Sequence, residues 1–328
     1  MKLCIVGAGA IGGFIGARVA ANTDAPVSAL ARGATLAALR RHGWRLRLGD
    51  RLLQAPAHAS DDPTELGVQD VVVIAVKAPS LETVAGAIGP LIGPNTTVLS
   101  TQNGVPWWYF ENETGELAGL RLESVDPGGV IAASIPARSV VGSLVYFATD
   151  LAGPGVVRHI EGNRISLGEP DGTRSDRIKG TAEAFIKAGL RAPVTTRLRS
   201  EMFVKLLGNA AFNPISALTR ATLVKMAQDR HVRALVTEIM TEVSAVATRL
   251  GITLPVSIEQ RIAGAEAVGE HKTSMLQDLE LGRPMELDCI AGALVELGTK
   301  LEIPMPNLKA VYALTKLLGE TAQAAKAS

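Results

Sequence analysis

Residues 1–21 read MKLCIVGAGAIGGFIGARVAA, and this stretch is the strongest indication of the fold. Lys2 to Val6 is a short apolar run typical of a buried strand, and Gly13 to Ala21 has the pattern of a helix. Between them lies a GxGxxG sequence at residues 7–12. A strand, a glycine turn and a helix in this order predict the first unit of a parallel α/β domain, with a phosphate site at the helix N-terminus.

Each glycine of this motif has a separate physical reason. We expect Gly7 to permit the tight turn, Gly9 to let the backbone approach a pyrophosphate, and Gly12 to let helix and sheet pack closely. Ala10 and Ile11 complete the loop, where unpaired helix N–H groups would face the phosphates. The motif therefore predicts a dinucleotide-binding site. The competing interpretation is a glycine turn that binds nothing.

Residue 32 bears on which dinucleotide is bound. A second strand is predicted at Val27 to Ala31, and Arg32 follows it, twenty residues after Gly12. An Asp or Glu at this point would accept hydrogen bonds from the ribose hydroxyls of NAD. A guanidinium accepts none, but it can make a bidentate contact with a 2′-phosphate. Arg32 therefore favours NADPH over NADH, unless it is only a surface charge on a loop.

The alternation of strands and helices continues along the chain. Strands are predicted at Val71 to Val76 and at Thr96 to Ser100, with a helical period from Leu81 to Ile88 between them. This alternation indicates a parallel sheet covered on both faces. The long segments of the last third all have helical spacing. We therefore predict a Rossmann-type dinucleotide-binding domain over residues 1–196 and an all-helical domain over residues 197–328.

Smaller elements are predicted from local patterns. They are an antiparallel pair within Arg45 to Leu53, strands at Val156 to His159, Arg164 to Leu167 and Leu190 to Val194, and a helix near Asp176 to Ala188. The Ala-rich tail after Gly319 is expected to fray.

Composition excludes several function classes. The 328 residues carry 33 basic and 32 acidic side chains. The chain therefore lacks the excess of basic residues that is typical of a nucleic-acid-binding surface. Cys4 and Cys289 stand outside any CxxC or His/Cys cluster, so we expect neither a disulfide framework nor a metal site. Apart from the glycine-interrupted start, no apolar run approaches the length that spans a bilayer. We expect a cytoplasmic protein with a small-molecule substrate and no nucleic-acid or membrane partner.

Two candidate site residues follow predicted strands. Lys77 comes directly after Val71 to Val76, at the carboxyl edge of the sheet where ligands bind in such folds. Asn103, within Gln-Asn-Gly, follows the next strand and places an amide beside the expected nicotinamide. Each has a plain alternative, because Lys77 could be a solvated strand end and Asn103-Gly104 an ordinary turn.

A third candidate is a polar stripe on one helix. Lys205, Asn209 and Asn213 are spaced i, i+4 and i+8, so they share one helical face. The residues around them are mostly apolar, which predicts a polar line on a largely buried helix. Buried amides and an ammonium need partners, and a ligand cleft would supply them. A structural network or an exposed face is the alternative.

Taken with these residues, three further segments complete a pattern. The chain also contains GAGAIGG at residues 7–13, KTSMLQD at 272–278 and ELD at 286–288. These segments occur together with the Gln-Asn-Gly segment and with the stripe of one lysine and two asparagines. The pattern resembles the ketopantoate reductase (2-dehydropantoate 2-reductase) family, from Met1 to about Pro306. The resemblance implies NADPH-dependent reduction of ketopantoate to D-pantoate, a precursor of pantothenate and coenzyme A.

The resemblance also implies roles for individual residues. Lys205 would be the general acid at the carbonyl oxygen, and Glu286 would hold the substrate hydroxyl and the lysine. Ser274 would bind the substrate carboxylate. The remaining matches are two substrate-pocket amides and two residues beside the nicotinamide: Asn209, Asn213, Lys77 and Asn103. These roles agree with ketone chemistry, since a cationic donor stabilises an alkoxide that exists only in the transition state.

Two features depart from the family pattern. His271 stands where family members often carry an Asn, so it is a candidate substrate contact whose charge changes near neutral pH, or an ordinary surface His. The aromatic segment Trp107 to Phe110 either walls the substrate cleft or packs in the core. The Gly-containing loop from Glu111 to Gly129 has the length of a mobile cover.

These departures leave alternatives open. A relative on the same scaffold could reduce another 2-oxo acid or a bulkier ketone. A non-catalytic NADP-sensing protein would keep the glycine loop but would not need Lys205 and Glu286 together. Apolar stripes at Leu235 to Val246 and at Ala291 to Leu301 also suggest a homodimer, because they exceed what one packed layer needs.

Overall fold

The computed structural model describes residues 1–111 and 117–327 of the chain. The chain divides into two compact units, and each is described by itself. Unit 1 consists of Met1–Gln102, Trp108–Leu120 and Gly129–Leu198, and unit 2 consists of Asn103–Trp107, Arg121–Gly128 and Arg199–Ser328. Neither unit is one continuous stretch of sequence.

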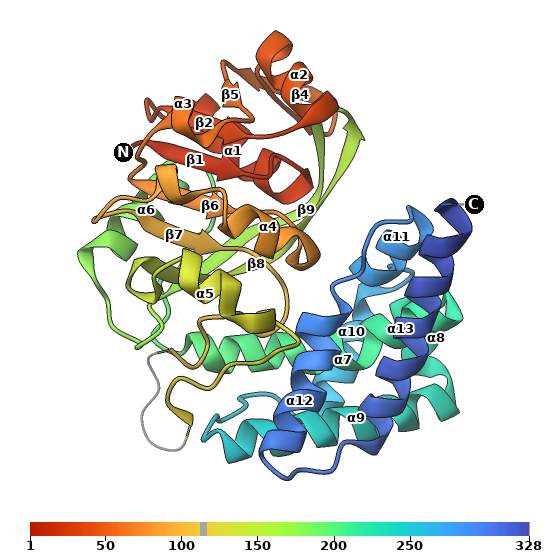
Figure 1. Ribbon diagram of the computed structural model, residues 1–328. Helices are drawn as coiled ribbons and strands as arrows, with labels where there is room; N and C mark the ends of the chain where they lie inside the picture. Colours follow the sequence, from red (N-terminus) through yellow and green to blue (C-terminus); the bar gives the residue numbers. More distant parts are fainter. Residues whose placement is uncertain (112–116, 328) are drawn as a thin grey trace. The chain divides into compact units, whose positions relative to one another are not determined.

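Unit 1 is built on one sheet of nine strands with the order β4-β3-β9-β8-β7-β6-β1-β2-β5 (Figure 1). The strands are β1 (Leu3–Val6), β2 (Val27–Leu30), β3 (Trp44–Leu48), β4 (Arg51–Ala55), β5 (His58–Ser60), β6 (Val71–Ile74), β7 (Thr97–Ser100), β8 (Val140–Gly153) and β9 (Val156–Gly168). β1 pairs in parallel with both β2 and β6, and β6, β7 and β8 are parallel neighbours. The pairs β3–β4 and β8–β9 are antiparallel. The predicted Rossmann-type sheet is thus confirmed, with antiparallel pairs added.

The α-helices of unit 1 connect these strands. They are α1 (Ala10–Asn22), α2 (Gly33–His42), α3 (Pro63–Leu66), α4 (Leu81–Ala85), α5 (Val130–Ser134) and α6 (Asp176–Lys187), with short 3₁₀ turns at Ala78–Ser80, Gly89–Leu91, Pro127–Gly129 and Ala137–Ser139. Helix α1 begins at Ala10, three residues before the predicted start at Gly13. Helix boundaries commonly shift by this much, since glycine-rich first turns give weak propensity signals.

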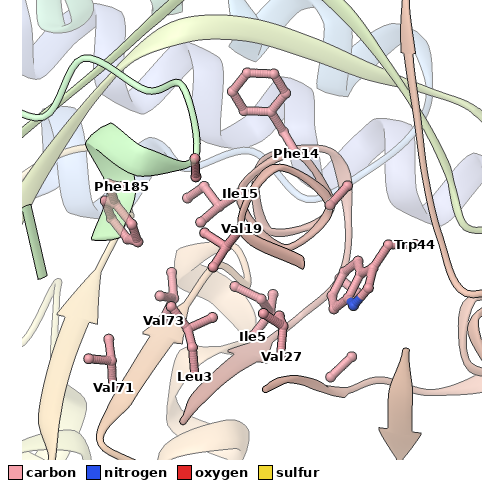
Figure 2. Packing of buried hydrophobic residues seen from close by; sticks show 14 of the residues in the cluster. Leu3, Ile5, Phe14, Ile15, Val19, Val27, Trp44, Val71, Val73 and Phe185 are labelled. Atoms are coloured by element: carbon pink, nitrogen blue, oxygen red, sulfur yellow. The ribbon is translucent and has the colours of Figure 1, made fainter. Parts of the chain in front are cut away.

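The core of unit 1 lies between α1 and one face of the sheet (Figure 2). Odd-numbered strand residues such as Leu3, Ile5 and Val73 point to the same face, because side chains alternate along a strand. Gly16 lets α1 lie directly against Trp44, since an added Cβ would come within 2.5 Å of the indole ring. This close approach fixes the helix whose first turn forms the glycine loop.

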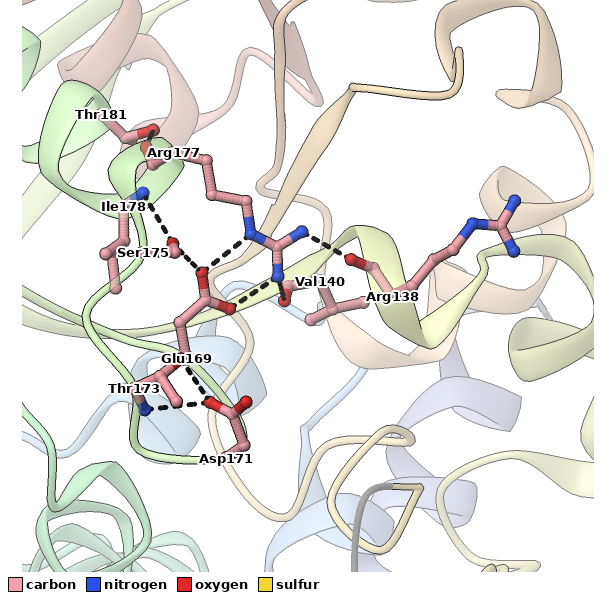
Figure 3. Close-up of polar contacts among 9 residues, drawn as sticks. All are labelled: Arg138, Val140, Glu169, Asp171, Thr173, Ser175, Arg177, Ile178 and Thr181. Atoms are coloured by element: carbon pink, nitrogen blue, oxygen red, sulfur yellow. Dashed lines mark hydrogen bonds and ion pairs between the residues drawn. The ribbon is translucent and has the colours of Figure 1, made fainter.

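A buried ion pair joins three segments of unit 1 (Figure 3). Glu169, just after β9, is 4% exposed, and both of its oxygens accept hydrogen bonds from Arg177 on α6, at 2.8 and 2.6 Å. The same guanidinium donates to the carbonyl oxygen of Arg138, in the turn before β8, and to that of Val140, the first residue of β8. Ser175, the N-cap of α6, donates its hydroxyl to Glu169. The pair therefore ties the end of β9 to the start of both α6 and β8.

Unit 2 is helical in the part that the structure describes. Its helices are α7 (Leu198–Thr219), α8 (Leu223–Gln228), α9 (Arg230–Arg249), α10 (Ile258–Val268), α11 (Ser274–Glu280), the π-helix η6 (Asp288–Gly292), α12 (Ala293–Lys300) and α13 (Pro306–Ala327). The predicted all-helical second domain is confirmed. No helix among the described residues has the length and apolar character to cross a bilayer.

The two apolar stripes that suggested a homodimer pack within unit 2. Ile239 and Val243 on α9 and Leu294 and Leu297 on α12 are fully buried, and α9 contacts both α12 and α13. Most of both stripes is therefore packed inside one chain. A homodimer remains a prediction without this support.

Three smaller predictions need correction. The tail after Gly319 is not frayed but continues α13 to Ala327, because Ala, Gln and Lys are strong helix formers. The two predicted strands within residues 156–167 are one strand, β9, which continues through a register shift at Gly162. Leu190 to Val194 forms only isolated bridges to β9, since Pro193 has no N–H to extend a ladder. The antiparallel pair within Arg45 to Leu53 is confirmed as β3 and β4.

The aromatic segment is buried. Trp107, Trp108, Tyr109 and Phe110 are each at most 6% exposed. In unit 1, Trp108 packs on Gly142, where an added Cβ would lie 2.6 Å from the indole, and Tyr109 meets Phe110 edge to face with ring centroids 4.7 Å apart. This burial favours core packing over a wall of a substrate cleft.

The predicted mobile cover, Glu111 to Gly129, is partly outside the described residues, which omit 112–116. Its later part is anchored within unit 2. The Glu296 carboxylate accepts hydrogen bonds from the amides of Glu123 and Ser124, at 3.0 and 2.9 Å, and from the Ser124 hydroxyl at 2.7 Å. Burial alone would raise the pKa of Glu296, but these donors hold it below its ordinary value. The segment Arg121–Gly128 is therefore a fixed part of unit 2.

Candidate active site

The strand order of unit 1 reverses next to β1. After β1 the chain forms β2 and β5 on one side, and it then returns to form β6, β7 and β8 on the other. Ligands of open α/β sheets bind where the strand order reverses, beyond the carboxyl ends of the strands. The glycine loop follows β1 and Lys77 follows β6, so both lie at this edge.

The geometry of the glycine loop fits a bound pyrophosphate. Gly7 has a φ of +91°, and its added Cβ would lie 2.6 Å from the Val76 side chain. An added Cβ on Gly12 would lie 2.3 Å from the carbonyl oxygen of Gly7. By contrast, Gly9 has nothing within 4 Å. Two glycines are therefore required by packing, while the third leaves open space beside the start of α1.

The start of α1 supplies hydrogen-bond donors to that open space. Gly9 is the N-cap and has no side chain to cap the helix. The amides of Ala10 and Ile11 lie in the first turn, where no helical carbonyl precedes them. Such a helix end attracts anions through both its N–H groups and its dipole. These donors fit the phosphates of a dinucleotide.

The remaining cofactor candidates lie at the ends of neighbouring strands. Arg32 is exposed at the N-cap of α2, directly after β2. Lys77 is half-buried and forms the N-cap of the 3₁₀ turn after β6. Gln102, which the sequence did not single out, donates to the carbonyl oxygens of Ile74 and Val76 at 3.2 and 2.7 Å. Gln102 thereby joins the end of β7 to the end of β6.

In unit 2, the polar stripe lies on α7 as predicted by its spacing. Lys205 and Asn209 are half-buried and Asn213 is buried. Burial lowers the pKa of Lys205 to about 8, and the negative charge of Glu286 opposes this shift. Lys205 thus gives up its proton more readily than an ordinary lysine, and the charge of Glu286 favours the protonated form.

Glu286 also has an amide partner from a distant part of the sequence. Asn103 Nδ2 donates to Glu286 Oε2 at 2.9 Å, although 183 residues separate them in the chain. Asn103, predicted beside the nicotinamide, thus belongs to unit 2. The structure brings Lys205, Glu286 and Asn103 into one charged and hydrogen-bonded group.

Ser274, at the start of α11, and His271, three residues before it, show no hydrogen bond to that group among the described residues. Ser274 is exposed in the first turn of α11, next to Thr273, which caps the helix by accepting from the Leu276 amide. His271 is half-buried, and its backbone bonds to Gly269 and Leu223. Their substrate roles therefore remain predictions.

The loop that leads from α11 to Glu286 is held by a pair that sequence reasoning missed. Asp278 is 3% exposed and accepts from Arg283 Nε at 3.1 Å, while the Arg283 amide donates to the Asp278 carbonyl at 2.8 Å. The signal was present, since Asp278 ends the quoted KTSMLQD segment. Its partner five residues later carries no motif.

Comparison with known families decides the assignment. A model described as ketopantoate reductase PanE/ApbA matches residues 3–172, and one described as ketopantoate reductase PanE/ApbA C terminal matches residues 197–319. The chain belongs to the ketopantoate reductase family. It is therefore an oxidoreductase of the kind that acts on a ketone or CH–OH group.

Individual members of the ketopantoate reductase family are similar over the whole chain. The 2-dehydropantoate 2-reductase of Mesorhizobium japonicum is 49% identical over 318 residues, which cover 97% of this chain and 98% of the relative. A structure from Ralstonia solanacearum MolK2, provisionally assigned as a ketopantoate reductase, has a TM-score of 0.93 at 42% identity and covers 98% of both chains. D-mandelate dehydrogenase with NADH and anilino(oxo)acetate has a TM-score of 0.82 at 21% identity, covers 98% of this chain and 99% of its own, and shares the fold alone.

Proposed function

We propose that the chain reduces the ketone of 2-dehydropantoate with NADPH to give D-pantoate, a step of pantothenate and coenzyme A biosynthesis. The observation that carries this proposal is the group of Lys205, Glu286 and Asn103 within unit 2. The 49% identity to a 2-dehydropantoate 2-reductase supports the substrate. A protein that only sensed NADP would have no need for a lysine of lowered pKa beside a carboxylate.

The proposed mechanism assigns the proton to Lys205. When bound, NADPH supplies the hydride. As the carbonyl oxygen gains negative charge, the Lys205 ammonium stabilises it and then donates a proton to it. A pKa of about 8 suits this role, because the amine is mostly protonated at neutral pH and yet gives up its proton readily.

Glu286 and Asn103 serve the lysine in this mechanism. The carboxylate of Glu286 keeps Lys205 charged, and we propose that it also accepts a hydrogen bond from the substrate hydroxyl. Asn103 fixes that carboxylate by donating to Oε2. We further propose that Asn209 and Asn213 line the substrate pocket, with Ser274 and His271 binding the substrate carboxylate.

The proposed NADPH site uses the glycine loop, Lys77 and Arg32. Arg32→Ala should weaken NADPH binding by roughly 1 to 3 kcal/mol, the range for a lost charged hydrogen-bonding partner, and should leave NADH binding nearly unchanged. Titration of both dinucleotides by calorimetry measures this. Arg41→Ala, another exposed arginine at the far end of α2, is the control. Equal losses for NADPH and NADH would show that Arg32 only supports the fold.

The pH dependence of turnover follows from the state of Lys205. A general acid must be protonated, so kcat should be level below pH 8 and fall as the pH rises through the pKa of about 8. Glu286→Gln removes the charge that raises this pKa, so the falling limb should move to lower pH. Single-turnover rates across the pH range measure both profiles. An unchanged limb in Glu286→Gln would contradict the assigned coupling.

The decisive assay follows NADPH oxidation with purified protein and 2-dehydropantoate. Phenylglyoxylate and a series of bulkier 2-oxo acids serve as competing substrates, and NADH serves as the competing cofactor. A kcat/KM for 2-dehydropantoate far above all others establishes the proposed substrate. Tight NADPH binding with turnover only of another ketone would support ketone reduction by NADPH but would contradict 2-dehydropantoate as the substrate.

Two organisational proposals accompany this function. We assign dinucleotide binding to residues 1–196 and substrate chemistry to residues 197–328. The hydrogen bond from Asn103 to Glu286 supports the view that the substrate chemistry also uses a residue of the first range. The homodimer, and a cytoplasmic location for the biosynthetic step, remain parts of the proposal.

A further inference from the structure

A π-helix begins two residues after Glu286. The segment Asp288–Gly292, η6, has π-helical hydrogen bonding and runs straight into α12. π-Turns are rare, and they concentrate at functional sites because they redirect backbone groups. In this chain the redirected groups belong to Cys289, three residues after the carboxylate that faces Lys205.

The segment from Asn103 to Val105 is bonded to Cys289 at several atoms. The Val105 amide donates to the Cys289 carbonyl oxygen at 2.9 Å. Cys289 Sγ lies 3.3 Å from the carbonyl oxygen of Asn103 and 3.5 Å from that of Glu286. The Cys289 thiol can therefore donate to the main-chain carbonyl of Asn103 or of Glu286. These are the two residues whose side chains are hydrogen-bonded to each other.

Gly104 makes this close approach possible. Its φ is +93°, and an added Cβ would lie 2.2 Å from the carbonyl oxygen of Cys289 and 2.6 Å from its carbonyl carbon. These are backbone atoms, so a side chain at residue 104 could be accommodated only by moving the whole segment away from η6. Asn103 would move with it.

The Cys289 side chain is suited to donate a hydrogen bond and not to react. It is 6% exposed. Burial, together with the charges of Glu286 and Asp288, raises the pKa of the Cys289 thiol well above its ordinary value, so it keeps its proton. The π-helix itself is fixed to α13, because Asp288 Oδ1 accepts from the Tyr312 hydroxyl at 2.6 Å and from Lys316 Nζ at 3.2 Å.

We propose that Gly104 and Cys289 are positioning residues of this site, which hold the main chain of Asn103 so that its amide fixes the Glu286 carboxylate toward Lys205. Neither residue needs to touch substrate or cofactor. The inference rests on the proposed function for its kinetic consequence. Its geometric consequence, the placement of Glu286, can be measured without any substrate.

Gly104→Ala is the first test. We expect kcat to fall by about 10- to 100-fold, the cost of a misplaced catalytic group, with the KM for NADPH changed little. The falling limb of the pH profile should also move to lower pH, as in Glu286→Gln. Gly251→Ala is the matched control, since Gly251 in unit 2 has a φ of +69° and nothing within 4 Å of an added Cβ. If Gly104→Ala loses no more kcat than this control, or keeps its pH limb, the proposal is wrong.

A cysteine series tests the thiol. Cys289→Ser keeps a donor and should retain most of the activity, whereas Cys289→Ala should lose roughly three- to tenfold in kcat, as expected for one hydrogen bond. Cys4→Ala, at a fully buried cysteine in β1, is the control for a lost core thiol. Cys289→Ala with the kcat and pH profile of the parent protein would overturn the role of Cys289.

A substrate-free measurement separates this proposal from the proposed function. Acetic anhydride labels neutral amines, so the labelling of Lys205 at different pH values, quantified by mass spectrometry, reports its pKa. Gly104→Ala should shift that profile to lower pH in the same direction as Glu286→Gln, while Gly251→Ala should not. This result would support the positioning role even if 2-dehydropantoate were not the substrate. An unshifted profile in Gly104→Ala would overturn it even in an active reductase.

Discussion

Lys205→Ala is expected to lower kcat by about two or more orders of magnitude while NADPH binding stays nearly intact. The alanine removes both the positive charge at the developing alkoxide and the proton that completes the alcohol. The loss should therefore appear in kcat and in kcat/KM together, as for an interaction made mainly in the transition state.

Two companion variants of Lys205 divide its roles. Lys205→Arg keeps a charge but has a pKa too high to donate readily, so it should recover only the part of the rate that comes from electrostatics. Lys309→Ala removes an exposed lysine of α13 and should leave kcat unchanged. Binding of NADPH is followed by its fluorescence. If turnover of Lys205→Ala stays within a fewfold of the parent protein, the proton donor is another group.

The second large effect concerns stability. Arg177→Met should lower the free energy of unfolding by about 3 kcal/mol, because it leaves the Glu169 carboxylate, 4% exposed, without its counter-charge. We take the lower end of the range for a broken buried pair, since the Arg177 side chain is 34% exposed and water screens part of the interaction. Urea unfolding followed by circular dichroism measures the change.

Controls for this stability effect lie in the same unit. Combining Arg177→Met with Glu169→Gln should cost less than the sum of the single changes, because the second change removes the stranded charge. Arg158→Met breaks the exposed Arg158–Asp150 pair of β8 and β9 and should change stability little. If Arg177→Met lowers the free energy of unfolding no more than Arg158→Met does, the buried pair of Glu169 and Arg177 does not stabilise unit 1.

The parts of the fold and the site that the sequence predicted are those encoded locally. The glycine loop could be predicted from residues 7–12 because strand, turn and helix are adjacent, and because Gly7 and Gly12 each meet a specific neighbour while Gly9 leaves open space. The α7 stripe could be read because helical spacing alone aligns Lys205 with Asn209. In both cases a few consecutive residues carry the geometry.

What the sequence did not reveal depends on pairings between distant residues. The roles of Gly104 and Cys289 depend on the folded chain, which brings two residues 185 positions apart in the sequence into contact. The buried pair of Glu169 and Arg177 carries no motif, although only eight residues separate its members. The tail after Gly319 was misjudged for the opposite reason, since its helix propensity was there to be used.

The path of the chain between the two units has a consequence for recombining this protein with others. Asn103–Trp107 and Arg121–Gly128 belong to unit 2 although they are encoded within the sequence of unit 1. They carry the amide partner of Glu286 and the backbone donors to Glu296. A gene segment for residues 199–328 alone would leave both carboxylates without these partners. The helical unit therefore cannot be transferred as one continuous segment. A chimera made with a single crossover would lack the two segments of unit 2 that are encoded earlier in the chain.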